Sequence, residues 1–207
     1  MKKRSLLLLV AVVLGLLVTP VWADTLLYDN GPINGTIDSY TIGRGKTGNS
    51  FTLSAASNLT TAQIGLWLYP GQTPVQVDWA IGTAFDDNTY GSGTSVFSNT
   101  KLAQQGWGVY DLYESIFSLS LASLGAGTYW LTLTNATSTD SGYDVYWDIK
   151  KGPSAARTMV IDGAIDSESF QIYGTPSGPT AAPEPATMLL LGLGLVGLAG
   201  ARRKFKK

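Results

Sequence analysis

The sequence predicts an all-β protein: an antiparallel β-sandwich of jelly-roll type over residues 24–174, flanked by an N-terminal signal-peptide helix and a C-terminal transmembrane helix. Within residues 24–174, apolar side chains recur with a period of two, as in strands that bury one face. Gly, Ser, Thr and Asn separate these short runs. No convincing long helix lies between them, and short strands of this kind are typical of sandwiches.

The N-terminal 23 residues have the three parts of a secretory signal peptide. Met1–Arg4 is cationic, and residues 5–18 form an apolar run. Val21 and Ala23 then place small residues at positions −3 and −1 of a cleavage site before Asp24. A retained N-terminal anchor is the alternative interpretation.

The first half of the domain contains five predicted strands: Thr25–Tyr28, Asp38–Ile42, Ser50–Leu53, Gln63–Tyr69 and Val75–Gly82. The last two flank a Pro- and Gly-containing turn, so we expect them to pair as a hairpin. In the fifth strand Val75, Val77, Trp79 and Ile81 share one face, which predicts that Trp79 is buried. The glycine-rich residues 83–95 are predicted to form a long loop.

The second half begins with the longest apolar-rich stretch, residues 109–121. Its end alternates like a strand, whereas the pattern of residues 109–115 leaves a helix open. Residues 128–134 and 143–149 alternate clearly, and the second of these strands predicts a buried Trp147. Residues 170–173 form the closing strand, and the Pro- and Gly-containing residues 175–182 form a linker.

Charge is distributed unevenly along the chain. Residues 24–179 contain 6 of the 14 Lys and Arg residues and 14 of the 15 Asp and Glu residues, which gives this part a net charge near −8. An acidic domain is a poor nucleic-acid binder, because attraction to phosphates dominates that affinity. The chain has no Cys and no His. Disulfides, Ser-His-Asp triads, Cys-His dyads and His or Cys metal sites are therefore excluded.

The C-terminus has three consecutive parts. The triplet Pro183, Glu184 and Pro185 comes first, then an apolar run over residues 186–201, then a basic tail over residues 202–207. Sixteen helical residues span roughly 24 Å, slightly less than a hydrocarbon core of about 30 Å. Snorkelling basic side chains can supply the difference. The basic residues that stop the helix and keep its end cytoplasmic are Arg202, Arg203 and Lys204.

This C-terminal arrangement resembles the PEP-CTERM sorting signal of Gram-negative bacteria. The resemblance implies an exported precursor that is held transiently in the inner membrane and processed near the triplet by an exosortase, a membrane transpeptidase. It also implies a final location in the outer envelope or extracellular matrix, since many such proteins accompany exopolysaccharide or biofilm production. An ordinary single-span anchor that stays in place is the alternative.

The domain itself resembles exported β-domains of the choice-of-anchor class. That resemblance implies the fold and export, and it brings no established catalytic residues. The phrases that carry it are residues 27–32, 50–53, 77–81, 127–131 and 168–174.

Two kinds of candidate site remain. Flat aromatic side chains suit sugar rings, and Trp107 and Trp130 are the tryptophans that we expect to be exposed enough for sugar contact, with core packing as the alternative. Asp86 and Asp87 are candidate calcium ligands in a glycine-rich loop, with a solvated acidic loop as the alternative. No other cofactor is expected.

No acid–base pair identifies an enzyme, because Glu114 and Glu168 are the only glutamates of the domain and no spacing relates them. We therefore expect a non-enzymatic protein with a structural or adhesive role. A carbohydrate-binding module that contacts exopolysaccharide is the alternative, and a glycan-active enzyme is a third.

Overall fold

The computed structural model describes residues 24–177. The predicted signal peptide, most of the linker, the Pro183–Pro185 triplet, the apolar run and the basic tail lie outside these residues. The first compact unit of the chain ends at Pro176. Over the described range all regular structure is β, and no helix there is long and apolar enough to cross a membrane.

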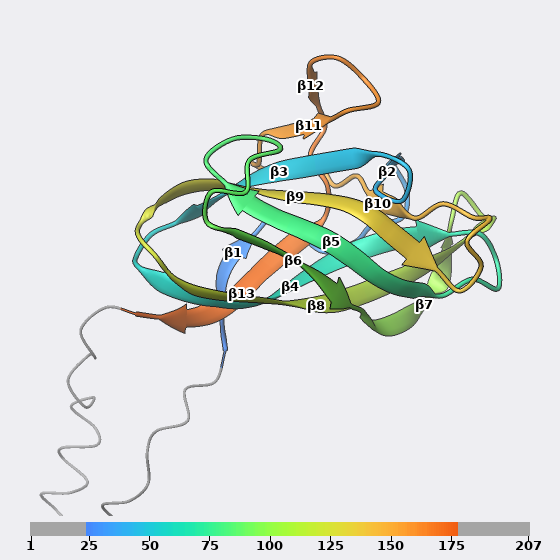
Figure 1. Ribbon diagram of the computed structural model, residues 1–207. Helices are drawn as coiled ribbons and strands as arrows, with labels where there is room; N and C mark the ends of the chain where they lie inside the picture. The colour runs from blue at the N-terminus through green and yellow to red at the C-terminus, as the bar shows by residue number, and fades with distance from the viewer. Residues whose placement is uncertain (1–23, 178–207) are drawn as a thin grey trace, which may run out of the picture. The chain divides into compact units, whose positions relative to one another are not determined.

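Two antiparallel sheets pack face to face, which confirms the predicted β-sandwich (Figure 1). The seven-stranded sheet is built around β4, which pairs with β8 along one edge and with β13 and then β10 along the other. The outer pairs are β1 on β13, β2 on β10 and β7 on β8. Its strands are β1 (Thr25–Asp29), β2 (Ser39–Thr41), β4 (Ser57–Leu68), β7 (Ser98–Gly106), β8 (Tyr110–Leu124), β10 (Tyr146–Asp148) and β13 (Phe170–Pro176).

The six-stranded sheet has the order β12-β11-β3-β9-β5-β6. Its centre is β9, which pairs with β3 on one side and β5 on the other. Its strands are β3 (Lys46–Leu53), β5 (Pro74–Gly82), β6 (Gly91–Val96), β9 (Gly127–Ser138), β11 (Ala156–Thr158) and β12 (Ala164–Ile165).

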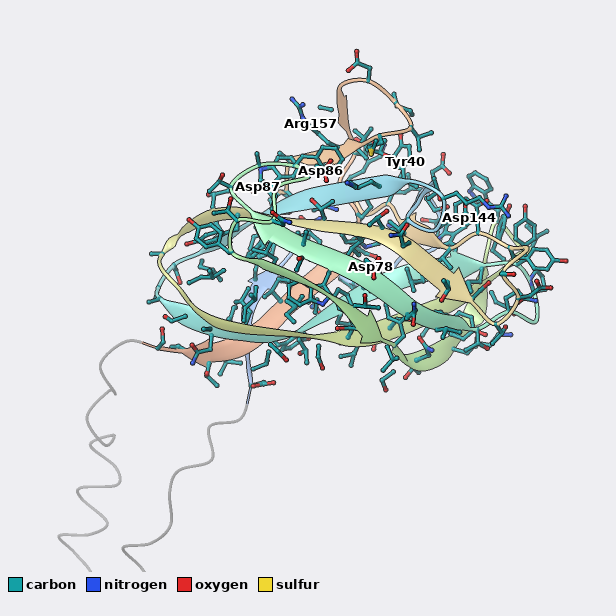
Figure 2. All side chains as sticks on the ribbon, viewed as in Figure 1. Tyr40, Asp78, Asp86, Asp87, Asp144 and Arg157 are labelled. Carbon is teal, nitrogen blue, oxygen red and sulfur yellow. The ribbon has the colours of Figure 1, made fainter. Side chains whose placement is uncertain are left out.

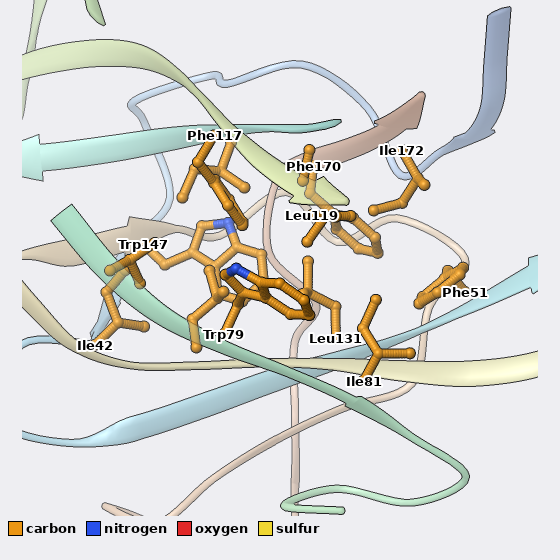
Figure 3. Packing of buried hydrophobic residues seen from close by; sticks show 14 of the residues in the cluster. Ile42, Phe51, Trp79, Ile81, Phe117, Leu119, Leu131, Trp147, Phe170 and Ile172 are labelled. Carbon is orange, nitrogen blue, oxygen red and sulfur yellow. The ribbon is translucent and has the colours of Figure 1, made fainter. Parts of the chain in front are cut away.

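The hydrophobic core lies between the two sheets (Figure 3). Trp147 and Phe117 come from the seven-stranded sheet, and Trp79 and Leu131 come from the six-stranded one. The predicted burial of Trp79 and Trp147 is confirmed. Each such side chain gains roughly 1.5–3 kcal/mol or more from leaving water. All strand pairings and core side chains of the described part lie between Thr25 and Pro176, so this segment has a hydrophobic core of its own.

The predicted hairpin of the fourth and fifth strands is wrong. β4 and β5 belong to different sheets, so the turn between them carries the chain across the sandwich. Both strands bury apolar side chains. The sequence pattern is the same whether two such strands pair in a hairpin or face each other across a core, so it does not distinguish the two arrangements. The predicted loop over residues 83–95 is also shorter, because β6 begins at Gly91.

The helix left open for residues 109–115 is absent, because β8 is one strand of fifteen residues. Tyr113 and Phe117 point into the core, while Leu112 on the other face is also buried. A loop covers it there, since a Cβ at Gly35 would meet the Leu112 side chain. Burial on both faces hides the period of two that marks a strand.

Three more strands, β7, β11 and β12, were not predicted, and polar strand ends account for further differences. β3 starts at Lys46 and β9 continues to Ser138, where Gly, Thr and Asn residues suggested loops. β10 covers only Tyr146–Asp148, and Tyr143 is exposed instead of lying in that strand. β13 reaches Pro176, so it includes the first two residues of the predicted linker.

Candidate functional site

Aromatic side chains gather at one end of the sandwich, where β4 ends and β8 and β10 begin. Asp144 lies at this end and is labelled in Figure 2. We call the group the aromatic end; its members are Trp67, Tyr69, Trp107, Tyr110, Tyr143 and Tyr146.

The rings of the aromatic end form a continuous series of contacts. Trp67 lies 5.4 Å from Trp107 and 5.7 Å from Tyr110, measured between ring centroids. Tyr69 lies 5.1 Å from Tyr110 and 5.2 Å from Tyr143. Trp67 is 1% exposed, whereas Trp107, Tyr143 and Tyr69 are 58%, 44% and 39% exposed. The result is an exposed aromatic surface on a buried support.

A tight turn presents Trp107. The Val109 amide donates to the Gly106 carbonyl at 3.0 Å, and Trp107 and Gly108 between them have φ angles of 48° and 70°. Two positive φ angles are typical of the type I′ hairpin turn, in which Asn or Gly is the usual residue. Gly106 lies against Trp67, since a Cβ there would come within 2.7 Å of the indole ring. A bulky Trp at positive φ is strained, so the turn holds this side chain outward at a cost.

The hydroxyls of Tyr110 and Tyr146 remain neutral. A hydrogen bond with Tyr69, together with burial, raises the pKa of Tyr110 to about 12. Burial also raises the pKa of Tyr146 above its ordinary value. These hydroxyls can therefore donate and accept hydrogen bonds over the whole physiological pH range.

A polar hollow adjoins the exposed rings at Tyr143, with Arg44, Ser141 and Asp144 in its lining. Arg44 donates from Nη2 to the Gly142 carbonyl at 2.7 Å. The Asp144 carboxylate accepts from the Thr41 hydroxyl at 2.7 Å. The edge of the aromatic end thus carries fixed charged and hydroxyl groups.

Trp130, the second predicted sugar contact, lies elsewhere. It is partly exposed on β9 of the six-stranded sheet, where its ring contacts Phe85 at 6.2 Å. No ring contact joins it to Trp107 among the described residues. The structure therefore does not combine the two predicted tryptophans; it places Trp107 beside tyrosines that the sequence reading did not select. No local signal in the sequence links Tyr69, Tyr110 and Tyr146, because the pairing of β4 with β8 and β10 brings them together.

The two predicted calcium ligands are occupied by protein groups. Asp87 accepts hydrogen bonds from the backbone amides and hydroxyls of Thr83 and Thr89, and these bonds lower its pKa, that from the Thr89 hydroxyl most. Asp86 forms an ion pair with Lys46. Across residues 24–177 no group of three or more acidic side chains could hold a metal ion. Calcium binding stays a prediction that the structure does not test.

A second hollow lies on the outer face of the six-stranded sheet, and Figure 2 labels Asp78 and Asp86 beside it. The Asp78 carboxylate accepts from the Thr94 hydroxyl and, at 2.8 Å, from the Asn135 amide. Both carboxylates of this hollow thus have protein partners.

The remaining acidic feature is internal. Asp148 and Glu168 are completely buried. Asp148 accepts from the Asn34 and Gly35 amides at 3.0 Å and from the Trp67 indole at 2.7 Å. Burial raises the pKa of Glu168 well above its ordinary value. Without solvent contact, Glu168 cannot meet a substrate.

Comparison with known protein families gives a match at the C-terminus. Residues 181–204 match the PEP-CTERM protein-sorting motif, which includes the Pro183–Pro185 triplet and the first three basic residues of the tail. No curated protein matches the chain. The predicted sorting motif is thus confirmed, and it implies an exported, membrane-anchored precursor that an exosortase processes. The resemblance to choice-of-anchor domains stays a prediction.

Proposed function

We propose that this chain is an exosortase-processed protein of the outer envelope or extracellular matrix of a Gram-negative bacterium, where its β-sandwich has a structural or adhesive role among exopolysaccharides. In this proposal the signal peptide is cut between Ala23 and Asp24. Residues 186–201 hold the precursor in the inner membrane, and processing near the Pro183–Pro185 triplet releases it. The observation that carries the proposal is the sorting motif at residues 181–204.

The state of the acidic side chains supports a non-enzymatic role. Glycoside hydrolysis needs two carboxyl groups that face a substrate across about 5–10 Å. Glu168 is buried, while Asp78 and Asp86 are held by hydrogen bonds and an ion pair within the protein. A sandwich of this kind fits contact and support better than catalysis.

A second candidate function is that of a carbohydrate-binding module that contacts exopolysaccharide. The observation that favours it is the aromatic end, in which three rings are exposed together. The two candidates share one location and one delivery route.

Processing in the producing cell tests the main proposal. A variant in which Pro183, Glu184 and Pro185 are all replaced by Ala is expected to stay in the inner membrane, whereas the natural protein is released without its basic tail. Pro179→Ala, outside the matched motif, is the control and should be processed normally. Mass spectrometry of the extracellular protein decides: a mature form that retains residues 202–207 contradicts the proposal.

A further inference from the structure

We infer that the aromatic end is a binding site for the flat faces of a polysaccharide chain, with Trp107, Tyr69 and Tyr143 as the stacking surface. The inference rests on the proposed function and names its site and its class of ligand. It concerns binding by residues 24–177 and does not depend on how the precursor is processed.

The first argument is the exposure of Trp107. An indole that is 58% exposed gains little from the hydrophobic effect, although it contacts Trp67 with its edge. It also occupies a backbone conformation with a φ of 48°, which is strained for a residue of this size. Stability alone favours Asn at this position. A strained and exposed Trp therefore points to a contact outside the protein.

The second argument is the chemistry of the surface. A pyranose ring has a flat face of C–H groups and a rim of hydroxyls. The exposed rings offer apolar faces for the C–H groups, and the tyrosine hydroxyls offer partners for the rim. The adjoining hollow adds the Arg44 guanidinium and the Asp144 carboxylate at the edge. This alternation of flat apolar area with short hydrogen-bonding groups matches a sugar ligand better than it matches the apolar surface of a partner protein.

The third argument is the shape of the site. Trp107, Tyr69 and Tyr143 belong to one row of ring contacts, which is joined through the buried Trp67 and the partly buried Tyr110. The row extends over several rings, and its exposed members leave it open to solvent. An open row of this kind accepts successive units of a chain and does not require a chain end. The ligand class is therefore a polysaccharide and not a free monosaccharide.

The fourth argument is the position of the site in the domain. Pro176 pairs with Ser57 at the start of β4, and Tyr69 directly follows the other end of that strand. Twelve strand residues span roughly 40 Å. The described chain thus ends, on the side of its sorting motif, at one end of the sandwich. The aromatic end lies at the opposite end, where neither β1 nor β13 covers it (Figure 1).

Binding by residues 24–177, which contain the whole core, tests the inference. The probes are insoluble cellulose, chitin, xylan and β-1,3-glucan, and the matching oligosaccharides of one to six units, followed by co-sedimentation and tryptophan fluorescence. We expect at least one series to bind, with an affinity that rises with chain length. Trp107→Asn and Tyr69→Ala should each weaken that binding about tenfold or more.

Tyr90→Ala is the matched control. Tyr90 is 42% exposed, like the tyrosines of the site, but its ring contacts Tyr129 at 5.1 Å and none of the aromatic end. It should leave binding unchanged. Trp107→Asn removes the indole and also supplies the residue that the turn prefers, so loss of binding cannot be assigned to unfolding if its thermal transition is retained.

Three results would overturn the inference. One is that a folded natural domain binds none of the four series. Another is that Trp107→Asn and Tyr69→Ala bind as well as the natural domain. A third is a dimer, seen by sedimentation velocity, that both substitutions abolish, because the aromatic end is then an interface between two copies of the chain.

Discussion

Glu168 has no solvent contact, and neither of its carboxyl oxygens has a hydrogen-bond partner within residues 24–177. A charged carboxylate in such a place is strongly disfavoured. The folded protein therefore keeps the proton that an unfolded chain releases near pH 4.5. Between that pH and the raised pKa of the folded state, the free energy of unfolding falls as the pH rises, and this part of the stability is complete only below the ordinary pKa.

Glu168→Gln is expected to remove most of this pH dependence and to raise the free energy of unfolding at pH 7 by roughly 1–3 kcal/mol, because the amide is neutral at every pH. Urea titrations at pH 4, 5.5, 7 and 8.5 measure the effect. Glu114→Gln, at a partly exposed position of β8, is the matched control and should keep the slope of the natural protein. A natural domain that is equally stable at all four pH values would contradict the expectation.

Asp87 illustrates how one carboxylate can organise a loop. Its carboxylate accepts hydrogen bonds from the amides and hydroxyls of Thr83 and Thr89, which lie on both sides of the turn between β5 and β6. Asp87→Ala is expected to lower the melting temperature and to expose residues 83–90 to proteolysis. Because these partners already use both carboxylate oxygens, EDTA and added calcium should leave the melting temperature of the natural domain unchanged. A rise with calcium would instead revive the predicted metal site.

At the scale of the element, two substitutions in the β7–β8 turn separate the effect of backbone strain at Trp107 from the effect of packing against Trp67. Trp107→Asn is expected to change the free energy of unfolding by no more than about 1 kcal/mol, because relief of the positive φ offsets the lost contact with Trp67. Gly106→Ala should lower it by about 1–3 kcal/mol, because the new Cβ would press on the Trp67 ring. Chemical denaturation measures both. Equal losses in the two variants would show that the turn is not strained at Trp107.

The strands also show which parts of the fold could be predicted from the sequence. The part of β9 around Leu131 and Leu133 could be predicted because apolar and polar residues alternate there, although Thr132 on the other face is also buried. β8 could not be predicted throughout, since Leu112 is covered by a loop from far away in the sequence. Strands that face each other across the core and strands that pair in a hairpin bury the same residue types, so the sequence could not predict that β4 and β5 belong to different sheets.

The candidate site was predictable only in part, for the same reason. Trp107 could be selected because glycines flank it. Its neighbours Tyr69, Tyr110 and Tyr143 come from three separate connections, which the pairing of β4 with β8 and β10 brings together. No local pattern carries that information, because it exists only once the register of the sheet is fixed.

The first and last strands of the described domain pair with each other. β13 lies between β1 and β4, so the last described strand links the first strand of the chain to the sheet centre. A fragment of residues 24–169 is therefore expected not to fold, because it loses this strand together with the buried Phe170 and Ile172. The fragment of residues 24–177 should unfold in one cooperative transition by circular dichroism. A cooperative transition of similar midpoint in the shorter fragment would show that β13 is dispensable.

The place of β13 beside β4 also has a mechanical consequence. While the chain is held by its C-terminal segment, a load on the aromatic end pulls β13 along its own axis and away from Tyr69. The hydrogen bonds between β13 and β4 run across that axis from Phe170 to Pro176, so they are loaded together in shear and do not open one at a time. The strand that leads to the sorting motif is thereby joined to the sheet in the geometry that best resists force.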